Sequence, residues 1–140
     1  MRMTAVPAWM RLVRVFQKVD RASVEHLRQW DLSVAQFDVL AKVSGNQGLT
    51  QQELADRLLV TKGNVCQLLD RMEHNGLLVR QQEGRANRLF LTPAGKRLAE
   101  QVVPAQEAVV AKCFSPLNED EVRHLLALLR KLDRGLTPAL

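Results

Sequence analysis

The chain has 140 residues and a mass of 15.8 kDa, which is the usual size of a single domain. Its composition, 46% hydrophobic and 25% charged, is that of an ordinary globular protein and excludes a disordered tail. Twenty basic residues against 15 acidic residues give a net charge of +5, which favours an anionic partner, either a nucleic acid or a membrane surface. The two cysteines are too few for a disulfide scaffold and fit a cytoplasmic protein. The sequence lacks both the long apolar stretch of a membrane span and the apolar core of a signal peptide.

The first part of the chain predicts two helices. From Val6 to Val19, apolar residues recur at steps of three and four with charged residues between them, which is the pattern of an amphipathic helix. Ser33 then precedes a second helix, Val34–Val43, as its N-terminal cap. Gly45–Gly48 predicts the loop that follows.

The next two helices are short and closely spaced. Thr50 and Glu53 have the spacing of a capping box, in which each side chain bonds the other residue's backbone N–H at the start of a helix. Three residues, 59–61, separate this helix from the next, which ends at Asn75 and Gly76. Two short helices joined in this way predict a helix-turn-helix, whose second helix is placed to enter a DNA major groove. The apolar stripe of that second helix consists of Val65, Leu68, Leu69 and Met72.

A basic β-hairpin follows the helix-turn-helix. Leu77–Arg80 and Leu89–Thr92 are short runs of strand type, and the polar segment Gln81–Arg88 between them predicts a hairpin with a long loop. From position 79 to position 97 the chain has five basic residues and one acidic residue, a net charge of +4 that accounts for most of the excess. A hairpin of this charge beside a groove-sized helix suits contact with DNA phosphates and the minor groove.

Two further helices end the chain. Pro93 suits the first turn of a helix, Pro104 is expected to kink or break that helix, and Asn118 caps the last one. The terminal helices carry apolar stripes that a monomer of this size has little left to cover, so we expect them to form a homodimer interface. The alternative is that these stripes make the monomer's own core. They comprise Trp9, Val13, Phe16, Leu125, Leu126, Leu129 and Leu132.

With its apolar stripe turned inward, the second helix of the helix-turn-helix presents a polar face. Asn and Gln side chains can bond adenine bidentately, and Arg and Lys reach guanine or phosphate. An ordinary solvated helix face is the alternative, but the charge and location of the neighbouring hairpin favour duplex DNA as the partner, and we expect no membrane partner. The candidate DNA contacts are Thr50, Gln51, Thr61, Lys62, Asn64, Gln67, Arg71, Arg85, Asn87 and Arg88.

Two segments resemble the MarR family of winged-helix transcriptional regulators. They are TKGNVCQLLDRMEHNGLLVR at 61–80, which resembles the recognition helix of that family, and EGRANRLFLTPAG at 83–95, which resembles its wing. The resemblance implies that Arg85 enters the minor groove and that Asp70 and Arg71 are the family's paired Asp and Arg.

The wing departs from the family pattern at two positions. Glu83 stands where the family has Asp, and Gly84 stands at a commonly basic position. Glu83 lies two residues from Arg85, on the same side of an extended strand, so we expect these two side chains to pair in the free protein.

The resemblance also implies the organisation of the whole chain. The fold is expected to be mainly α-helical with a small β-hairpin, in the α+β class, and to form one domain, 1–140. A winged helix-turn-helix at 33–98 is flanked by dimerisation helices at 1–31 and 104–140.

Enzyme motifs and metal-ligand spacings are absent, and the three histidines are isolated, so we expect no catalysis, metal or cofactor.

By the same resemblance, the protein is a homodimeric, sequence-specific repressor that a small aromatic or phenolic ligand releases from a pseudo-palindromic operator. The ligand would bind between the dimerisation helices and the winged domain, and its candidate lining residues are Trp9, Phe16, His26, Trp30 and Phe37.

Two alternatives to this function stay open. One is a winged-helix module that binds a protein and not DNA; the other is a redox-sensing regulator in which oxidation of Cys66 releases DNA. Cys113, on an apolar face, is expected to be a packing residue.

Overall fold

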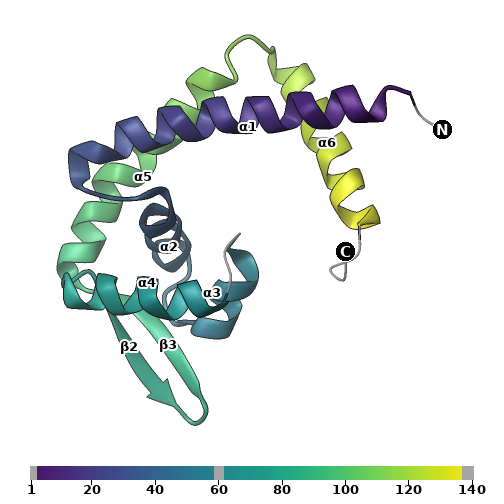
Figure 1. Cartoon of the computed structure of the whole chain (residues 1–140). Helices are drawn as coiled ribbons and strands as arrows, with labels where there is room; N and C mark the ends of the chain where they lie inside the picture. Colours follow the sequence, from purple (N-terminus) through teal and green to yellow (C-terminus); the bar gives the residue numbers. More distant parts are fainter. Residues whose placement is uncertain (1–2, 59–61, 137–140) are drawn as a thin grey trace.

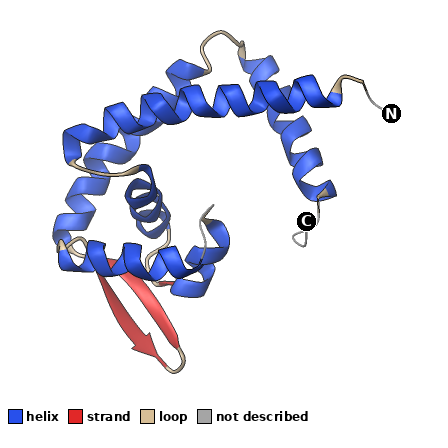
Figure 2. Cartoon of the chain, in the orientation of Figure 1, coloured by secondary structure: helices blue, strands red, loops and turns tan. Residues whose placement is uncertain are grey.

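The computed structural model describes residues 3–58 and 62–136 as a set of helices joined to a small antiparallel sheet (Figure 2). This confirms the predicted fold class. No helix within these residues is long and apolar enough to cross a membrane. The elements in chain order are α1 (Ala5–Leu27), a 3₁₀ turn (Arg28–Trp30), α2 (Val34–Gly45), β1 (Leu49–Thr50), α3 (Gln51–Arg57), α4 (Lys62–His74), β2 (Leu78–Glu83), β3 (Ala86–Leu91), α5 (Pro93–Cys113) and α6 (Glu119–Gly135).

Side-chain caps begin the helices where the sequence predicts them. The side chains of Ser33, Thr50 and Asn118 each accept a hydrogen bond from the backbone N–H three residues on. In return, the backbone N–H of each capping residue donates to the side-chain oxygen of that later residue. These bonds satisfy amides that have no partner within the helix. At the start of α5, the hydroxyl of Thr92 accepts from the N–H of Gly95 at 3.0 Å, and Pro93 occupies the first turn.

The three strands lie in the order β1-β3-β2, all antiparallel. β2 and β3 pair over their full length, and only Gly84 and Arg85 connect them. The predicted long loop was therefore wrong. Gly84 has φ +62° at the first central position of the turn, where tight hairpin turns favour glycine. The hairpin projects from the body of the molecule beyond α4 (Figure 1), so its polar strands lack the apolar alternation that marks a packed strand.

The core lies where the end of α1, α2, α3, α4, the sheet and the first half of α5 meet. Its buried side chains are Leu27, Leu32, Val39, Leu40, Val43, Leu49, Leu54, Leu58, Val65, Leu69, Met72, Leu78, Leu89, Leu91, Ala99 and Val102. From this core α5 runs on to Cys113 without the break predicted at Pro104. Pro104 removes only the N–H that would bond the carbonyl of Glu100, and both residues are exposed, so water can bond that carbonyl.

The two ends of the chain project from this core. The first half of α1 and the whole of α6 lie away from the winged half, and both termini are at the same end of the molecule (Figure 1). α6 contains no buried residue. Trp9, Phe16, Leu126 and Leu132 of the predicted stripes are 44–65% exposed. These four side chains are therefore not part of the monomer's core. For them, the alternative that the terminal stripes form that core is wrong.

Candidate nucleic-acid interface

The start of α3 is held by bonds within the protein. The hydroxyl of Thr50 accepts from the N–H of Glu53, and the Thr50 N–H donates to the Glu53 carboxylate, each at 3.1 Å. These hydrogen bonds hold the pKa of Glu53 below its ordinary range. The side-chain Nε2 of Gln51 donates to Sγ of Cys66 on α4 at 3.1 Å, which links the two helices of the helix-turn-helix. Thr50 and Gln51 thus have structural partners in the free protein.

α4 turns its apolar stripe inward and its polar face outward, as predicted. Val65, Leu69 and Met72 are buried, whereas Asn64, Gln67 and Arg71 are exposed. Thr61 lies outside the described residues, and the side chain of Lys62 is likewise not described. The exposed face therefore carries amide and guanidinium groups of the kind that bond base edges and phosphates.

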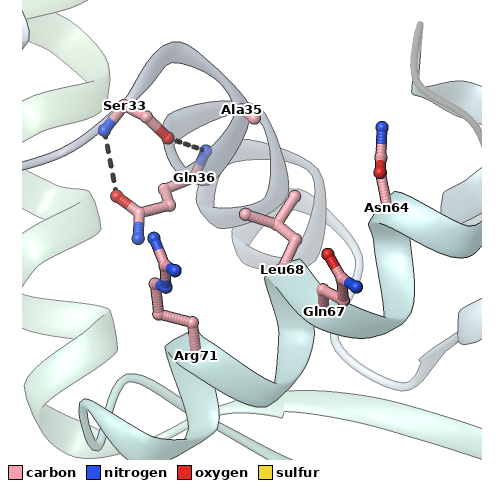
Figure 3. A pocket seen from close by; sticks show the side chains of 7 residues that line it. All are labelled: Ser33, Ala35, Gln36, Asn64, Gln67, Leu68 and Arg71. Carbon is pink, nitrogen blue, oxygen red and sulfur yellow. Dashed lines mark hydrogen bonds between the residues drawn. The ribbon is translucent and has the colours of Figure 1, made fainter.

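The exposed face of α4 borders a depression beside the start of α2. Figure 3 shows Asn64, Gln67 and Arg71 along one side of it, with Ser33 and Gln36 of the α2 capping box on the other. Its volume is about 330 Å³. Ser33 was predicted only as a helix cap, and no role was predicted for Gln36. Their place at the recognition surface depends on how α2 packs against α4, which a local pattern does not show.

The hairpin tip presents one arginine freely and holds another in place. Arg85 and Asn87 are exposed, and no carboxylate within the described residues forms an ion pair with Arg85. The predicted pair between Glu83 and Arg85 was wrong. Instead, Nε of Arg88 donates to Oε2 of Glu83 at 2.9 Å, and its Nη1 donates to the carbonyl of Gly48 at 2.9 Å. The tight turn explains this, because it places Glu83 and Arg88 as diagonal neighbours across the two strands.

Arg80 joins β2 to α4. Its side chain, 21% exposed, forms ion pairs with Asp70 and Glu73, and its backbone N–H donates to Oε2 of Glu73 at 3.1 Å. The Arg80 guanidinium lies 2.9 Å from Oε1 of Glu73 and, by its hydrogen bond, holds the pKa of that carboxyl below its ordinary value. Asp70 therefore pairs with Arg80, and its neighbour Arg71 forms no ion pair among the described residues. The sequence signal that was missed is a basic residue in the strand that directly follows an acidic helix end.

These pairs change the charge that the wing presents. Arg80 and Arg88 have carboxylate partners within the protein, so the +4 counted along the sequence overstates the free positive charge. Arg85, Lys96 and Arg97 remain exposed without an ion-pair partner among the described residues. Within positions 79–97, the free positive charge thus lies at the wing tip and in the first turns of α5.

The candidate ligand residues fall into two groups. His26 and Trp30 contact each other edge to face, with ring centroids 5.1 Å apart, and Phe37 packs against the core nearby on α2. Trp9 and Phe16 are exposed on the projecting part of α1, and at 1.5 Å per residue they lie about 25 Å and 15 Å along the helix from His26. One protomer therefore brings together only three of the five.

Both cysteines are exposed. Cys66 lies on α4 beside Gln51, as expected for the outward side of the recognition helix. Cys113 ends α5 and is exposed in the protomer, so its predicted packing role finds no partner within the described chain.

Comparison with known proteins extends these observations. The MarR family model matches residues 30–88, which run from the end of the 3₁₀ turn after α1 into β3 of the wing. An uncharacterized HTH-type transcriptional regulator of Bacillus cereus is 37% identical over 127 residues, covering 90% of this chain and 86% of the relative.

Solved structures agree with this relation. A mutant of MarR from Escherichia coli in complex with operator DNA superposes with a TM-score of 0.81 at 29% identity, covering 94% of this chain and 98% of the other. A MarR family protein of Mycobacterium tuberculosis in complex with salicylic acid gives 0.69 at 27% identity, covering 86% and 92%. The chain with this winged helix-turn-helix belongs to the MarR family of DNA-binding transcriptional regulators.

Proposed function

We propose that the protein is a homodimeric repressor that binds a pseudo-palindromic operator. The observation that carries the proposal is the exposed polar face of α4 beside a wing whose tip presents an exposed Arg85. Gln67 and Asn64 would bond base edges in the major groove, and Arg85 would enter the minor groove, where the concentrated negative potential attracts a guanidinium. The E. coli relative bound to operator DNA supports this assignment. Occupation of a promoter by such a dimer would block transcription.

The dimer rests on the exposed apolar surface of the two ends of the chain. Val6, Trp9 and Phe16 on α1 and Leu128 and Leu132 on α6 are each more than half exposed. Large apolar side chains exposed along two helices in this way are rare on monomers and typical of obligate interfaces. A twofold dimer presents two equal recognition helices, so its site should consist of two inverted half-sites about one helical turn, roughly 10 base pairs, apart.

A small aromatic effector would act at the junction of α1, α2 and α5. His26, Trp30 and Phe37 lie at this junction, between the projecting helices and the winged half. The relative in complex with salicylic acid supports a ligand of this size. α1 and α5 connect the expected dimer interface to the winged half of each protomer. A ligand bound at their junction with α2 would therefore change the spacing of the two recognition helices and weaken operator binding.

Arg85→Ala tests the DNA-binding role. An operator is first selected from a random duplex pool, and affinity is then measured by fluorescence anisotropy. We expect Arg85→Ala to lower operator affinity at least tenfold, about 1.4 kcal/mol, with an unchanged melting temperature because Arg85 has no structural partner among the described residues. Lys112→Ala, an equal change of charge in the last turn of α5, serves as the matched control; with its dimer shown to be intact by sedimentation, it should bind as the parent does. Parent-like binding by Arg85→Ala would remove the wing from recognition. Absence of any salt-dependent duplex binding by the parent would favour the protein-binding module.

A further inference from the structure

A cavity lies where the winged half meets the projecting helices. It has a volume of about 330 Å³ and is lined by α1, α2 and α5, through Ser23, Phe37, Asp38, Gln106 and Glu107 together with two valines. This volume is in the range of small-molecule pockets and suits a ligand with one aromatic ring. Phe37 supplies an aromatic wall, and the valines extend the apolar surface.

The neutral polar groups of this cavity are already bonded to one another. Gln106 is only 4% exposed; its Nε2 donates to Oγ of Ser23 at 2.8 Å, and the Ser23 hydroxyl donates to the carbonyl of Val19 at 2.9 Å. Oε1 of Gln106 lies 2.8 Å from Nδ1 of His26. Since this amide oxygen can only accept, Nδ1 of His26 carries the proton. This chain of bonds fixes α1 against α5. The carboxylates of Asp38 and Glu107 have no hydrogen-bond or ion-pair partner among the described side chains, so they are available to a ligand.

The charge of the wall has one sign. Asp38 is half-buried and Glu107 is exposed at the rim, and no described residue that lines the cavity is basic. Burial raises the pKa of the Asp38 carboxyl, which Lys42, one turn further along α2, only partly offsets. The folded protein therefore keeps a carboxylate in a place where ionisation is disfavoured, and a bound cation would relieve that cost.

We propose that this cavity binds a small aromatic ammonium ion, with the ring against Phe37 and the charged nitrogen between Asp38 and Glu107. A protonated amine gains from both carboxylates and from the aromatic wall, whereas an aromatic carboxylate would meet two charges of its own sign. The inference rests on the proposed function for its regulatory meaning, since it names the chemical class of the effector. The proposed ligand is a cation, and in this it differs from the salicylic acid in the complex of the Mycobacterium tuberculosis relative.

Three ligands that share one ring test the charge preference. Benzylamine, which is protonated at pH 7, benzyl alcohol and benzoate are titrated into the full-length protein without DNA, and binding is followed by calorimetry. We expect benzylamine to bind at least tenfold more tightly than benzoate, with benzyl alcohol between them. Asp38→Asn should remove most of this preference, and Glu107→Gln should reduce it. Glu100→Gln, an equal change of charge two turns away on α5 and outside the cavity, should keep it.

Two results would overturn the proposal: benzoate binding as tightly as benzylamine, or a preference that survives in both Asp38→Asn and Glu107→Gln. Failure of all three ligands to bind would overturn it as well. The proposed function is tested separately, by adding benzylamine to the protein–operator complex. A cation preference without release of DNA would contradict the effector mechanism and leave the cavity assignment standing. If the parent protein did not bind the operator even without benzylamine, the repressor proposal would be contradicted and the calorimetry would be unaffected.

Discussion

Replacing Arg80 by methionine tests whether the wing is held to the recognition helix by charge. The guanidinium joins β2 to two carboxylates of α4, those of Asp70 and Glu73, which lie ten and seven residues earlier in the chain. Methionine keeps most of the apolar stem that Arg80 packs against its neighbours and removes only the charged group. The change thus isolates the ion pairs from side-chain volume.

The loss of stability expected for Arg80→Met follows from how far the ion-paired side chains are exposed to water. Arg80 is 21% exposed and Glu73 is 38% exposed, so their charge-assisted hydrogen bond is screened in part and should contribute about 1.5 kcal/mol. Asp70 is 65% exposed, and its pair adds at most about 0.5 kcal/mol. We expect Arg80→Met to lower the free energy of unfolding by about 2 kcal/mol, which is about 6 °C in melting temperature for a chain of this length. Operator affinity should fall about fivefold, because the wing loses its fixed position.

Urea denaturation at one fixed protomer concentration measures the loss, since the stability of a dimer depends on concentration. The double-mutant cycle of Arg80→Met with Glu73→Gln should give a coupling energy of about 1 kcal/mol. Arg97→Met, an exposed arginine without an ion pair among the described residues, is the matched control and should change stability by less than about 0.5 kcal/mol. A coupling energy near zero would show that the pairs do not hold the wing.

Two further predictions concern stability. Gly95→Ala places a Cβ 2.0 Å from the carbonyl oxygen of Leu77, so urea denaturation should show a loss of at least about 3 kcal/mol; Gly135→Ala, with nothing within 4 Å of its Cβ, should change stability by less than about 1 kcal/mol. Acidification should remove the contribution of Glu73, whose pKa Arg80 lowers from the ordinary 4.5. A lowered pKa gives stability that is present above pH 4.5 and lost as the pH falls through the folded value, so acid unfolding of the parent should be steeper than that of Arg80→Met.

The helices could be predicted from the sequence because their signals are local. Ser33, Thr50 and Asn118 mark helix starts through contacts that span three residues, and the apolar stripe of α4 repeats within two turns. The hairpin was harder. Its strands are polar and project beyond the core, so the apolar pattern that identifies a strand stops at Arg80 while the backbone pairing continues to Glu83. Strand pairing depends on the partner strand, and a tight turn at Gly84 lets it extend to the tip.

In the candidate site too, features set by local sequence could be predicted, and features set by distant parts of the chain could not. The outward direction of Gln67 and Arg71 follows from helical periodicity and was predicted correctly. The partners of the charged residues were not, because each ion pair of the wing joins residues brought together by the fold. Glu83 has three arginines within five residues, Arg80, Arg85 and Arg88, and sequence distance favours Arg85, yet strand register places Arg88 beside it. Residue type and helix face can be read from sequence, whereas charge pairing requires the register.

The register has a measurable consequence for DNA binding. Binding releases about 0.9 counterions for each phosphate that a protein cation neutralises, so the slope of log affinity against log salt counts free cations at the interface. Arg88 is already bonded to Glu83 and to the Gly48 carbonyl, whereas Arg85 is free of ion pairs among the described residues. In a dimer with two wings, Arg85→Ala should therefore flatten the slope by about two units. Arg88→Gln should weaken binding by loosening the wing and leave the slope within about half a unit of the parent. Titrations of both variants on the selected operator between low and physiological salt provide the comparison. If Arg88→Gln flattened the slope as much as Arg85→Ala, Arg88 would have to leave Glu83 and bind phosphate in the complex. The ion pairs of the wing would then differ between the free protein and the DNA complex.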